Sequence, residues 1–397
     1  MLFRSDVPGE PMSASRRLLT ELMRERWGFE GIYVSDYDAI GELVAHGVAA
    51  DMVEAAALAL KAGMDLDMMS PAYPQGLKPA LDRGLVTIAD IDAAVLRVLR
   101  VKERLGLFDD PCGRGRVEGR TKAQARELAR EAAAASFVLL SNHDEVLPLA
   151  PTGGPIALIG PWVEDEGQML GSWYGLGDQE KVVTLREGLE AAFPKRQIRV
   201  AHGCDGDFAE DDEREAEDLV GIAAAVDLAR TCDVVLLAIG EPALMTGEAA
   251  SRADLGLTGR QADLARALID TGKPVVFLLT CGRPVLETEL LEEAAAVLVL
   301  WYPGSEAGHA VGDVVSGRRP PTGSLPISWP IDGGQIPIFY AERPSGRPYA
   351  EGEHFTTQYL DVPNTPLFPF GHGLSYAPLD LAEPRLDRTV LRAGESV

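Results

Sequence analysis

The amino-acid sequence predicts an α/β protein of more than one domain, with a mainly parallel sheet in its larger, C-terminal part. Short apolar runs alternate with segments of helical periodicity along most of the chain, a pattern typical of parallel strands that are covered by helices on both faces. The chain of 397 residues also exceeds the roughly 250–300 residues at which a single hydrophobic core usually stops growing. We therefore expect two or three domains.

The first part of the chain, residues 1–108, contains two strand–helix units. Apolar residues at helical spacing predict helices over residues 13–28, 52–62 and 88–105. Short apolar runs predict buried strands at residues 31–34 and 64–68. The first of these strands ends in the polar cluster 35–38, and in strand–helix architectures catalytic groups gather at this end of the strands.

A linker rich in Gly, Arg and Pro, residues 109–121, leads into the second part of the chain. A helix is expected at 122–136, and apolar runs predict strands at 137–140, 156–159, 198–201, 234–239, 275–279 and 296–300. The segment from 320 to 376 is irregular and rich in Pro, Gly and aromatic residues. Residues 377–397 look like the start of a further β domain.

Charge and composition exclude several classes of function. The formal net charge of −24 disfavours nucleic acid and membrane surfaces as partners. The four cysteines are scattered, so neither a metal site nor a disulfide framework is expected. No run of about 18 apolar residues predicts a membrane span, and the first residues lack the pattern of a secretory signal. Location stays open: a longer parent could be periplasmic or secreted, and otherwise cytoplasmic.

Short motifs stand in order along nearly the whole chain. They include Val34-Ser35-Asp36-Tyr37, Ile159-Gly160-Pro161, Gly171-Ser172-Trp173, Gly247-Glu248-Ala249-Ala250-Ser251-Arg252, Gly282-Arg283-Pro284, Trp301-Tyr302-Pro303-Gly304 and Phe370-Gly371-His372-Gly373-Leu374-Ser375-Tyr376. In this order they resemble glycoside hydrolase family 3, of the β-glucosidase and β-xylosidase type.

The resemblance implies a (β/α)8 barrel followed by an α/β sandwich domain, at residues 122–376, and a fibronectin type III-like domain, whose start would be residues 377–397. A barrel takes roughly 200–250 residues, and only about 108 precede the linker. We therefore expect residues 1–108 to be the C-terminal part of a barrel in a C-terminal fragment. Exposed strand edges in such a remnant would favour a homo-oligomer.

The resemblance also implies two catalytic carboxyl groups. Asp36 matches the family's nucleophile, and Glu248 matches its acid/base, with Glu241 at the end of a predicted strand as the rival. A retaining mechanism needs the two groups about 5–5.5 Å apart across the glycosidic bond, one ionised and one protonated. The competing interpretations are a helix cap or turn residue for Asp36 and a solvated loop residue for Glu248.

Four further side chains are candidates for substrate binding. Tyr37 would flank the sugar being cleaved and Trp173 would stack on the leaving group, although most Trp surface packs in cores. Arg252 and His46 could line the pocket, but at such positions these residues are more often structural.

The resemblance thus implies a retaining β-glucosidase that acts on a β-linked oligosaccharide or glucoside and needs no cofactor. A β-xylosidase or exo-glucanase is the next interpretation, and a non-catalytic remnant that binds carbohydrate or a partner is a third. Little turnover is expected from this chain alone, because the missing strands would carry the groups that grip the sugar.

Overall fold

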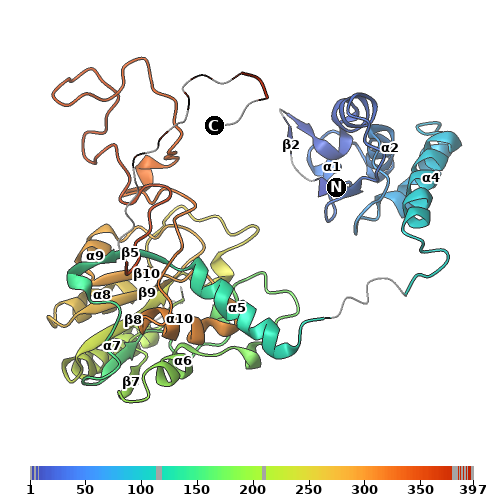
Figure 1. Ribbon diagram of the computed structural model, residues 1–397. Coiled ribbons are helices and arrows are strands. Elements are labelled where there is room, and N and C mark those ends of the chain that lie inside the picture. The colour runs from blue at the N-terminus through green and yellow to red at the C-terminus, as the bar shows by residue number, and fades with distance from the viewer. Residues whose placement is uncertain are drawn as a thin grey trace. The chain divides into compact units, whose positions relative to one another are not determined.

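The computed structural model describes residues 2–377 except 4–5, 8, 113–118 and 208–211, and a few single positions beyond 377. The chain forms two compact units, unit 1 at Met1–Gly119 and unit 2 at Arg120–Val397 (Figure 1). The expected start of a β domain at 377–397 lies almost entirely outside the described residues. Among the described residues, no helix combines the length and the apolar character needed to cross a bilayer.

Unit 1 consists of helices around short strands. Its helical segments are η1 (Met12–Ala14), η2 (Arg17–Arg26), α1 (Glu42–Ala45), α2 (Met52–Ala62), η3 (Ala72–Gly76), α3 (Leu77–Asp82) and α4 (Ile88–Arg104). Its strands are β1 (Leu2–Phe3), β2 (Asp6–Val7), β3 (Glu10–Pro11) and β4 (Val34–Ser35). The strand β4 pairs in parallel with β1, and Val34 also forms a parallel bridge with Leu66.

The predicted strands of unit 1 are longer than the observed ones. The run 31–34 becomes β4, which starts only at Val34, and the run 64–68 is reduced to the single bridge at Leu66. A strand requires hydrogen-bonded neighbours along its length, and among the described residues β4 pairs with Leu2 and Phe3 of β1 and forms a bridge to Leu66. The predicted helix 13–28 is also shorter and has π-type hydrogen bonding, in which the Trp27 N–H donates to the Leu22 carbonyl.

Local signals fix the ends of the longest helices in unit 1. The side chain of Asp51 caps the start of α2 by accepting from the Glu54 N–H, and Gly63 ends this helix with φ of 109°. Thr87 and Asp90 form a reciprocal capping box at the start of α4. These helices therefore agree with the ranges expected from the sequence to within one residue.

Unit 2 is an α/β layer structure. Its main helices are α5 (Lys122–Ser136), α6 (Leu185–Ala192), α7 (Asp212–Arg230), α8 (Gln261–Ile269), α9 (Thr288–Glu293) and α10 (Ala307–Val315). Its strands are β5 (Val138–Asn142), β6 (Ile156–Ile159), β7 (Ile198–Ala201), β8 (Val234–Gly240), β9 (Val275–Thr280) and β10 (Ala296–Val299). Single turns are η4 (His143–Glu145), η5 (Gln168–Leu170), η6 (Gln179–Lys181), η7 (Ala243–Met245), η8 (Gly304–Glu306) and η9 (Gly333–Gln335).

The six strands of unit 2 form one mixed sheet in the order β5-β10-β9-β8-β6-β7. All neighbouring pairs are parallel except the edge pair of β5 and β10, which is antiparallel. The expectation of a mainly parallel sheet is therefore confirmed, with one antiparallel edge strand that the alternating pattern did not predict. The order reverses between β6 and β8, and ligands of such sheets bind outside the carboxyl ends of the strands at this point.

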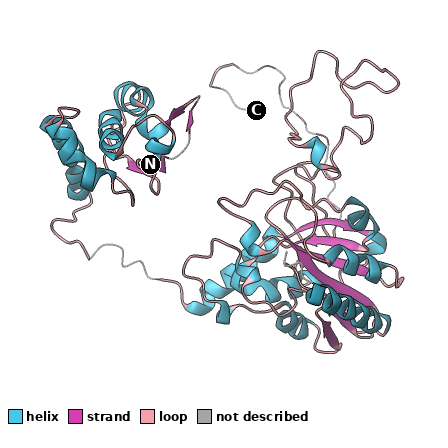
Figure 2. Ribbon diagram, turned by 180° about the vertical axis from the view of Figure 1, so that it is seen from behind, coloured by secondary structure: helices cyan, strands magenta, loops and turns pink. Residues whose placement is uncertain are grey.

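Helices cover both faces of the sheet, as Figures 1 and 2 show. One hydrophobic cluster joins a face of the sheet to α5, α6 and α10, and a second joins the other face to α7, α8 and α9. Along β8, Leu236 belongs to the first cluster, whereas its neighbours Val235 and Leu237 belong to the second. This alternation explains why the strands of unit 2 are apolar at nearly every position.

Candidate active site

An open groove of about 800 Å³ lies on unit 2 beside the point where the strand order reverses. It is lined by residues between 162 and 179 after β6, by Asp207 after β7, and by residues 242–244 after β8. All of these segments follow the carboxyl ends of parallel strands. The groove therefore occupies the position where α/β sheets bind ligands.

Hydrogen bonds tie the loops around this groove together. The buried side-chain amide of Gln168 donates to the carbonyl of Glu241 at 2.7 Å and accepts from the Ala243 N–H at 2.9 Å. The hydroxyls of Ser172 and Thr246 lie 3.4 Å apart. The loop after β6 is thus anchored to the loop after β8, although the two are more than 70 residues apart in the chain.

The anchored loops bring Gly247, the residue before Glu248, beside Trp173, which lines the groove. Gly247 has φ of 101°, and a Cβ added there would lie 2.4 Å from Nε1 of Trp173. Glu248 follows directly and is exposed, and the Trp173 side chain is 74% exposed. A Trp that packs in the core would be covered, so this exposure favours a binding role for Trp173.

The rival carboxylate, Glu241, has a different environment. It is 1% exposed and bonded to two arginines: Arg252 Nη1 donates to it at 3.0 Å, and Arg283 Nε lies 3.1 Å from the same oxygen. The Gly282 N–H is 3.4 Å from its second oxygen. Glu241 therefore links Arg252, Arg283 and the Gly282 backbone to one another. It also holds the guanidinium of Arg252 at the base of the loop that carries Glu248.

Burial also affects Tyr302, whose hydroxyl donates to the carbonyl of Glu241 at 2.9 Å. Desolvation of its ring raises the pKa of Tyr302 well above the ordinary value for tyrosine. The phenol therefore stays protonated at neutral pH and remains a hydrogen-bond donor to the loop after β8.

In unit 1, Asp36 is the first residue after β4 and is partly exposed. One carboxylate oxygen accepts from the Tyr37 N–H at 2.7 Å. The preceding residue, Ser35, is buried, and its hydroxyl accepts from the Met68 N–H at 2.8 Å. Asp36 is therefore held at a strand end with its side chain accessible, and the neighbouring Tyr37 is 60% exposed.

Two other predicted residues are placed less distinctively. His46 is exposed at the end of α1 in unit 1. Arg252 is engaged by Glu241 and also donates to the Gly256 carbonyl at 2.9 Å. Within the part of the chain that the structure describes, no three His, Cys, Asp or Glu side chains gather as ligands of a metal.

The sequence did not single out a buried ion cluster that supports the strand before Asp36. The Asp65 side chain is 0% exposed and lies 2.6 Å from both Arg24 and Arg97. It also accepts from the Tyr33 N–H at 2.8 Å, at the start of the segment that leads to Asp36. Stacked on Tyr33, the guanidinium of Arg24 is buried, which lowers its pKa. Asp65, a charged residue inside the apolar run 64–68, was the sequence feature that could have predicted this cluster.

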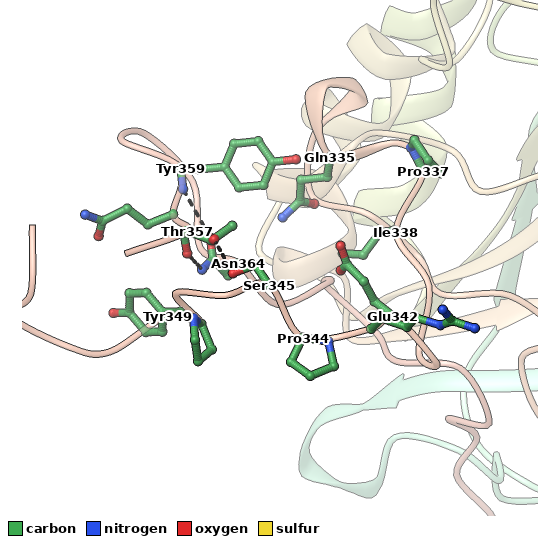
Figure 3. Close-up of a pocket in the computed structure, with 13 residues that line it drawn as sticks. Gln335, Pro337, Ile338, Glu342, Pro344, Ser345, Tyr349, Thr357, Tyr359 and Asn364 are labelled. Atoms are coloured by element: carbon green, nitrogen blue, oxygen red, sulfur yellow. Dashed lines mark hydrogen bonds between the residues drawn. The ribbon is translucent and has the colours of Figure 1, made fainter. Parts of the chain in front are cut away.

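A second hollow, of about 470 Å³, lies within the segment 335–364 (Figure 3). Its polar groups largely bond to one another: the hydroxyls of Ser345 and Thr357 lie 2.7 Å apart, and Asn364 bonds to both Thr357 and Tyr359.

Comparison with known families decides the class of this protein. The chain matches the model of the glycosyl hydrolase family 3 N terminal domain over residues 2–101 and that of the C-terminal domain over residues 137–376. The chain belongs to glycoside hydrolase family 3. The first family 3 model covers part of unit 1, and the second covers the sheet and loops of unit 2.

Relatives in the family carry names of two related activities. A periplasmic beta-glucosidase of Salmonella typhimurium is 37% identical over all of this chain and 54% of its own length, and a beta-xylosidase of Formosa agariphila is 35% identical over 98% of this chain and 54% of its own length. The crystal structure of a beta-glucosidase from Listeria innocua in complex with isofagomine matches with a TM-score of 0.85 at 36% identity, over 94% of this chain and 51% of that one. The chain spans about half the length of these family 3 relatives.

Proposed function

We propose that this protein is a retaining β-glycosidase that removes terminal β-D-glucosyl residues through a covalent glycosyl-aspartate intermediate. The observation that carries this proposal is the approach of Gly247, next to the exposed Glu248, to Trp173 at the groove of unit 2. An accessible carboxylate at a strand end in unit 1, Asp36, supports it as well. The membership of the family supports it, as do the names of the relatives.

The proposed roles follow from the environment of each side chain. Asp36 attacks the anomeric carbon as the nucleophile, and the N–H of Tyr37, which donates to its carboxylate, orients the side chain. Glu248 first donates a proton to the leaving oxygen and then activates the water that cleaves the intermediate. Tyr37 flanks the glycone, and Trp173 stacks on the leaving group. We assign Glu241 and Arg252 to positioning this loop, and His46 to the edge of the glycone pocket.

A β-xyloside is the alternative substrate, because relatives named β-xylosidases match nearly the whole chain. An exo-glucanase activity comes next. A glucosyl residue differs from a xylosyl residue by its hydroxymethyl group, so the ratio of turnover on aryl β-glucoside and aryl β-xyloside measures the preference directly.

The proposal extends to the organisation of the chain. We propose that residues 1–108 are the C-terminal part of a (β/α)8 barrel, 109–121 a linker, 122–376 the sandwich domain, and 377–397 the start of a fibronectin type III-like domain. A periplasmic location is proposed from the name of the Salmonella relative, and a neutral β-linked oligosaccharide or glucoside as the partner. Fractionation of the producing cells tests the location.

The test of the activity is labelling of Asp36. The protein tested is a chimera in which this chain replaces the matching segment of the Salmonella relative, because little turnover is expected from the chain alone. Incubation of the chimera with an activated 2-deoxy-2-fluoro β-glucoside is expected to add one fluoroglucosyl group to the peptide that contains Asp36, detected by mass spectrometry, and Asp36→Ala should abolish the label. The same measurement is made on the chain alone. Labelling of neither protein, while both are folded, would contradict the proposal.

A further inference from the structure

The segment after β10 contains a tyrosine, Tyr302, to which the proposed function assigns no role. Its hydroxyl donates to the backbone carbonyl of Glu241 at 2.9 Å, and the same carbonyl accepts from the side chain of Gln168 at 2.7 Å. A carbonyl oxygen has two lone pairs, so these two donors occupy it fully. The residue directly after β8 is therefore held from two sides, by the loop after β6 and by the segment after β10.

The backbone before Tyr302 directs the two aromatic side chains of this segment apart. Trp301 has φ of 57°, in the left-handed region that bulky residues rarely adopt. Its indole N–H donates to the carbonyl of Ser136 at the end of α5, at 3.1 Å. A strained backbone of this kind persists only where the surrounding contacts hold it, and such positions gather at functional sites. The strain at Trp301 therefore accompanies the placement of Tyr302 against the loops after β6 and β8.

The ring of Tyr302 occupies space that two glycines leave open. A Cβ added at Gly171, in the loop after β6, would lie 3.0 Å from Cβ and 3.1 Å from Cγ of Tyr302. A Cβ added at Gly282, after β9, would lie 3.5 Å from Cε2 of Tyr302 and 2.6 Å from Cγ2 of Thr246. Tyr302 therefore packs against the loops after β6 and β9 while it bonds to the residue after β8.

A compact turn connects Glu241 to the loop that carries Glu248. Thr246 closes this turn, because its hydroxyl donates to the carbonyl of Ala243 at 2.9 Å and its N–H donates to the same carbonyl at 3.2 Å. Gly247 and Glu248 follow directly. The point at which the Glu241 backbone is held thus sets where the loop that carries Glu248 begins.

We propose that Tyr302 is a positioning residue for the acid/base. Its hydroxyl fixes the backbone at Glu241 and, through the turn that follows, the place from which Glu248 delivers a proton to the leaving oxygen. The inference deepens the proposed function and rests on it for the role of Glu248. Position matters here because proton transfer requires the donor within about 2.6–3.2 Å of the atom that receives the proton.

Two matched variants separate this role from a general effect on stability. Tyr302→Phe removes the hydroxyl and leaves the Glu241 carbonyl its other donor. Tyr376→Phe is the control, because the hydroxyl of Tyr376 donates at 2.8 Å to the carbonyl of Val314 in α10, which also accepts from the Gly317 N–H at 3.0 Å. Each variant thus loses one hydrogen bond of a half-buried phenol and leaves no carbonyl without a donor.

The first measurement is amide hydrogen exchange of the chain itself, followed by mass spectrometry. Tyr302→Phe should speed exchange in peptides that cover residues 241–252 by about 2- to 12-fold, the effect of one lost hydrogen bond, whereas Tyr376→Phe should leave these peptides unchanged. Equal exchange in the wild type and Tyr302→Phe would overturn the proposal, whether or not the fluoroglucoside labels Asp36. If Tyr302→Phe fails to fold, Gly282→Ala tests the same contact, because its methyl group would displace Thr246, and it should speed exchange in the same peptides.

The second measurement compares two aryl β-glucosides as substrates of the chimera with the Salmonella relative. A phenolate leaving group needs the proton from Glu248, whereas 2,4-dinitrophenolate departs without it. Tyr302→Phe should lower kcat/KM for the phenyl glucoside about 10-fold and that for the dinitrophenyl glucoside less than about 2-fold, and Tyr376→Phe should change neither. An equal loss on both substrates would overturn the link to proton transfer. Faster exchange without labelling of Asp36 would support Tyr302 as the residue that positions the loop and reject the glycosidase.

Discussion

Two glutamates only seven positions apart have opposite surroundings, and this contrast separates a structural from a chemical role. Glu241 is buried between Arg252 and Arg283, and Glu248 is exposed. A buried carboxylate held by two guanidinium groups cannot reach a substrate, whereas one on an exposed loop can. This contrast is the ground on which we propose Glu248 as the acid/base and Glu241 as a residue that holds the loop.

The two glutamates should respond differently to substitution. Glu248→Ala is expected to change the free energy of unfolding by less than about 0.5 kcal/mol and to lower glycosidase activity by about 10²–10⁴-fold. Glu241→Ala removes the carboxylate that Arg252 and Arg283 share and leaves both guanidinium groups with carbonyl acceptors but without this counter-charge. It should destabilise unit 2 by about 3–5 kcal/mol. Thermal denaturation and aryl β-glucoside hydrolysis measure both effects, and a stable, inactive Glu241→Ala beside an active Glu248→Ala would reverse the assignment.

The half-buried carboxyl of Glu287, at the base of the same loop, should make the free energy of unfolding depend on pH. Burial raises the pKa of Glu287, the charge of Asp254 raises it further, and the Leu257 N–H, which donates at 3.0 Å, opposes this. Between the ordinary pKa of about 4.3 and the raised value, the folded protein binds more protons than the unfolded chain. The stability that this group contributes is therefore present at low pH and is lost as pH rises through that interval.

Glu287→Gln keeps an acceptor for the Leu257 N–H and removes the titration. We expect the free energy of unfolding of this variant to decline less than that of the wild type between about pH 4 and pH 7. Urea denaturation at a series of pH values measures the difference between the two proteins. Parallel curves would show that the carboxyl of Glu287 titrates alike in the folded and unfolded chains.

Among the elements of unit 2, α6 and α10 pack through their backbones. A Cβ added at Gly188 in α6 would lie 1.9 Å from the carbonyl of Gly308 in α10, and one at Gly308 would lie 1.9 Å from the Thr184 carbonyl. Glycine allows this close approach because it has no side chain. This packing places α10 against the same face of the sheet as α6. In this position α10 supports the turn that follows β10.

Gly188→Ala is expected to force the two helices apart and to destabilise unit 2 by at least about 1–3 kcal/mol. Gly346→Ala is the matched control, because no atom lies within 4 Å of an added Cβ at that position. The melting temperatures of the two variants measure the contrast. Equal melting temperatures would mean that α6 and α10 can separate without cost.

The chain as a whole is divided into two units with separate hydrophobic cores. The clusters of unit 1 contain residues between 12 and 94, and those of unit 2 contain residues between 133 and 376. No described residue belongs to clusters of both units. Each core therefore buries its apolar surface within its own unit, which is the condition for independent folding.

Limited digestion with trypsin tests this independence. The sequence 109–121 is rich in Gly and contains several arginines, so we expect early cleavage within it. The C-terminal product should keep the α/β circular dichroism spectrum and a cooperative thermal transition. Rapid further digestion within the core strands of unit 2 would show that this unit depends on unit 1 for its stability.

Much of the architecture of unit 2 could be predicted from local patterns. The runs at β6 and β7 were predicted with their observed bounds. In β6 a continuous apolar stretch between turn residues marks a fully buried strand, whereas β7 is a partly exposed edge strand that contains Arg199. Asp36, Glu248 and Trp173 could be named only through the resemblance of their motifs to glycoside hydrolase family 3. The short strands of unit 1 were overestimated, because the run of apolar residues does not reveal how many hydrogen-bonded neighbours are present.

Local sequence thus predicted most helices and buried strands, since caps, turns and apolar periodicity act over only a few residues, whereas the candidate carboxylates came from the resemblance to the family. It could not establish which glutamate is buried, because Arg283 meets Glu241 from 42 positions away in the chain. Nor could it reveal the antiparallel edge strand or the hydrogen bond of Tyr302 to the Glu241 carbonyl, since both depend on which segments meet in space. Pairing and desolvation are long-range effects, and they become visible only when the chain is folded.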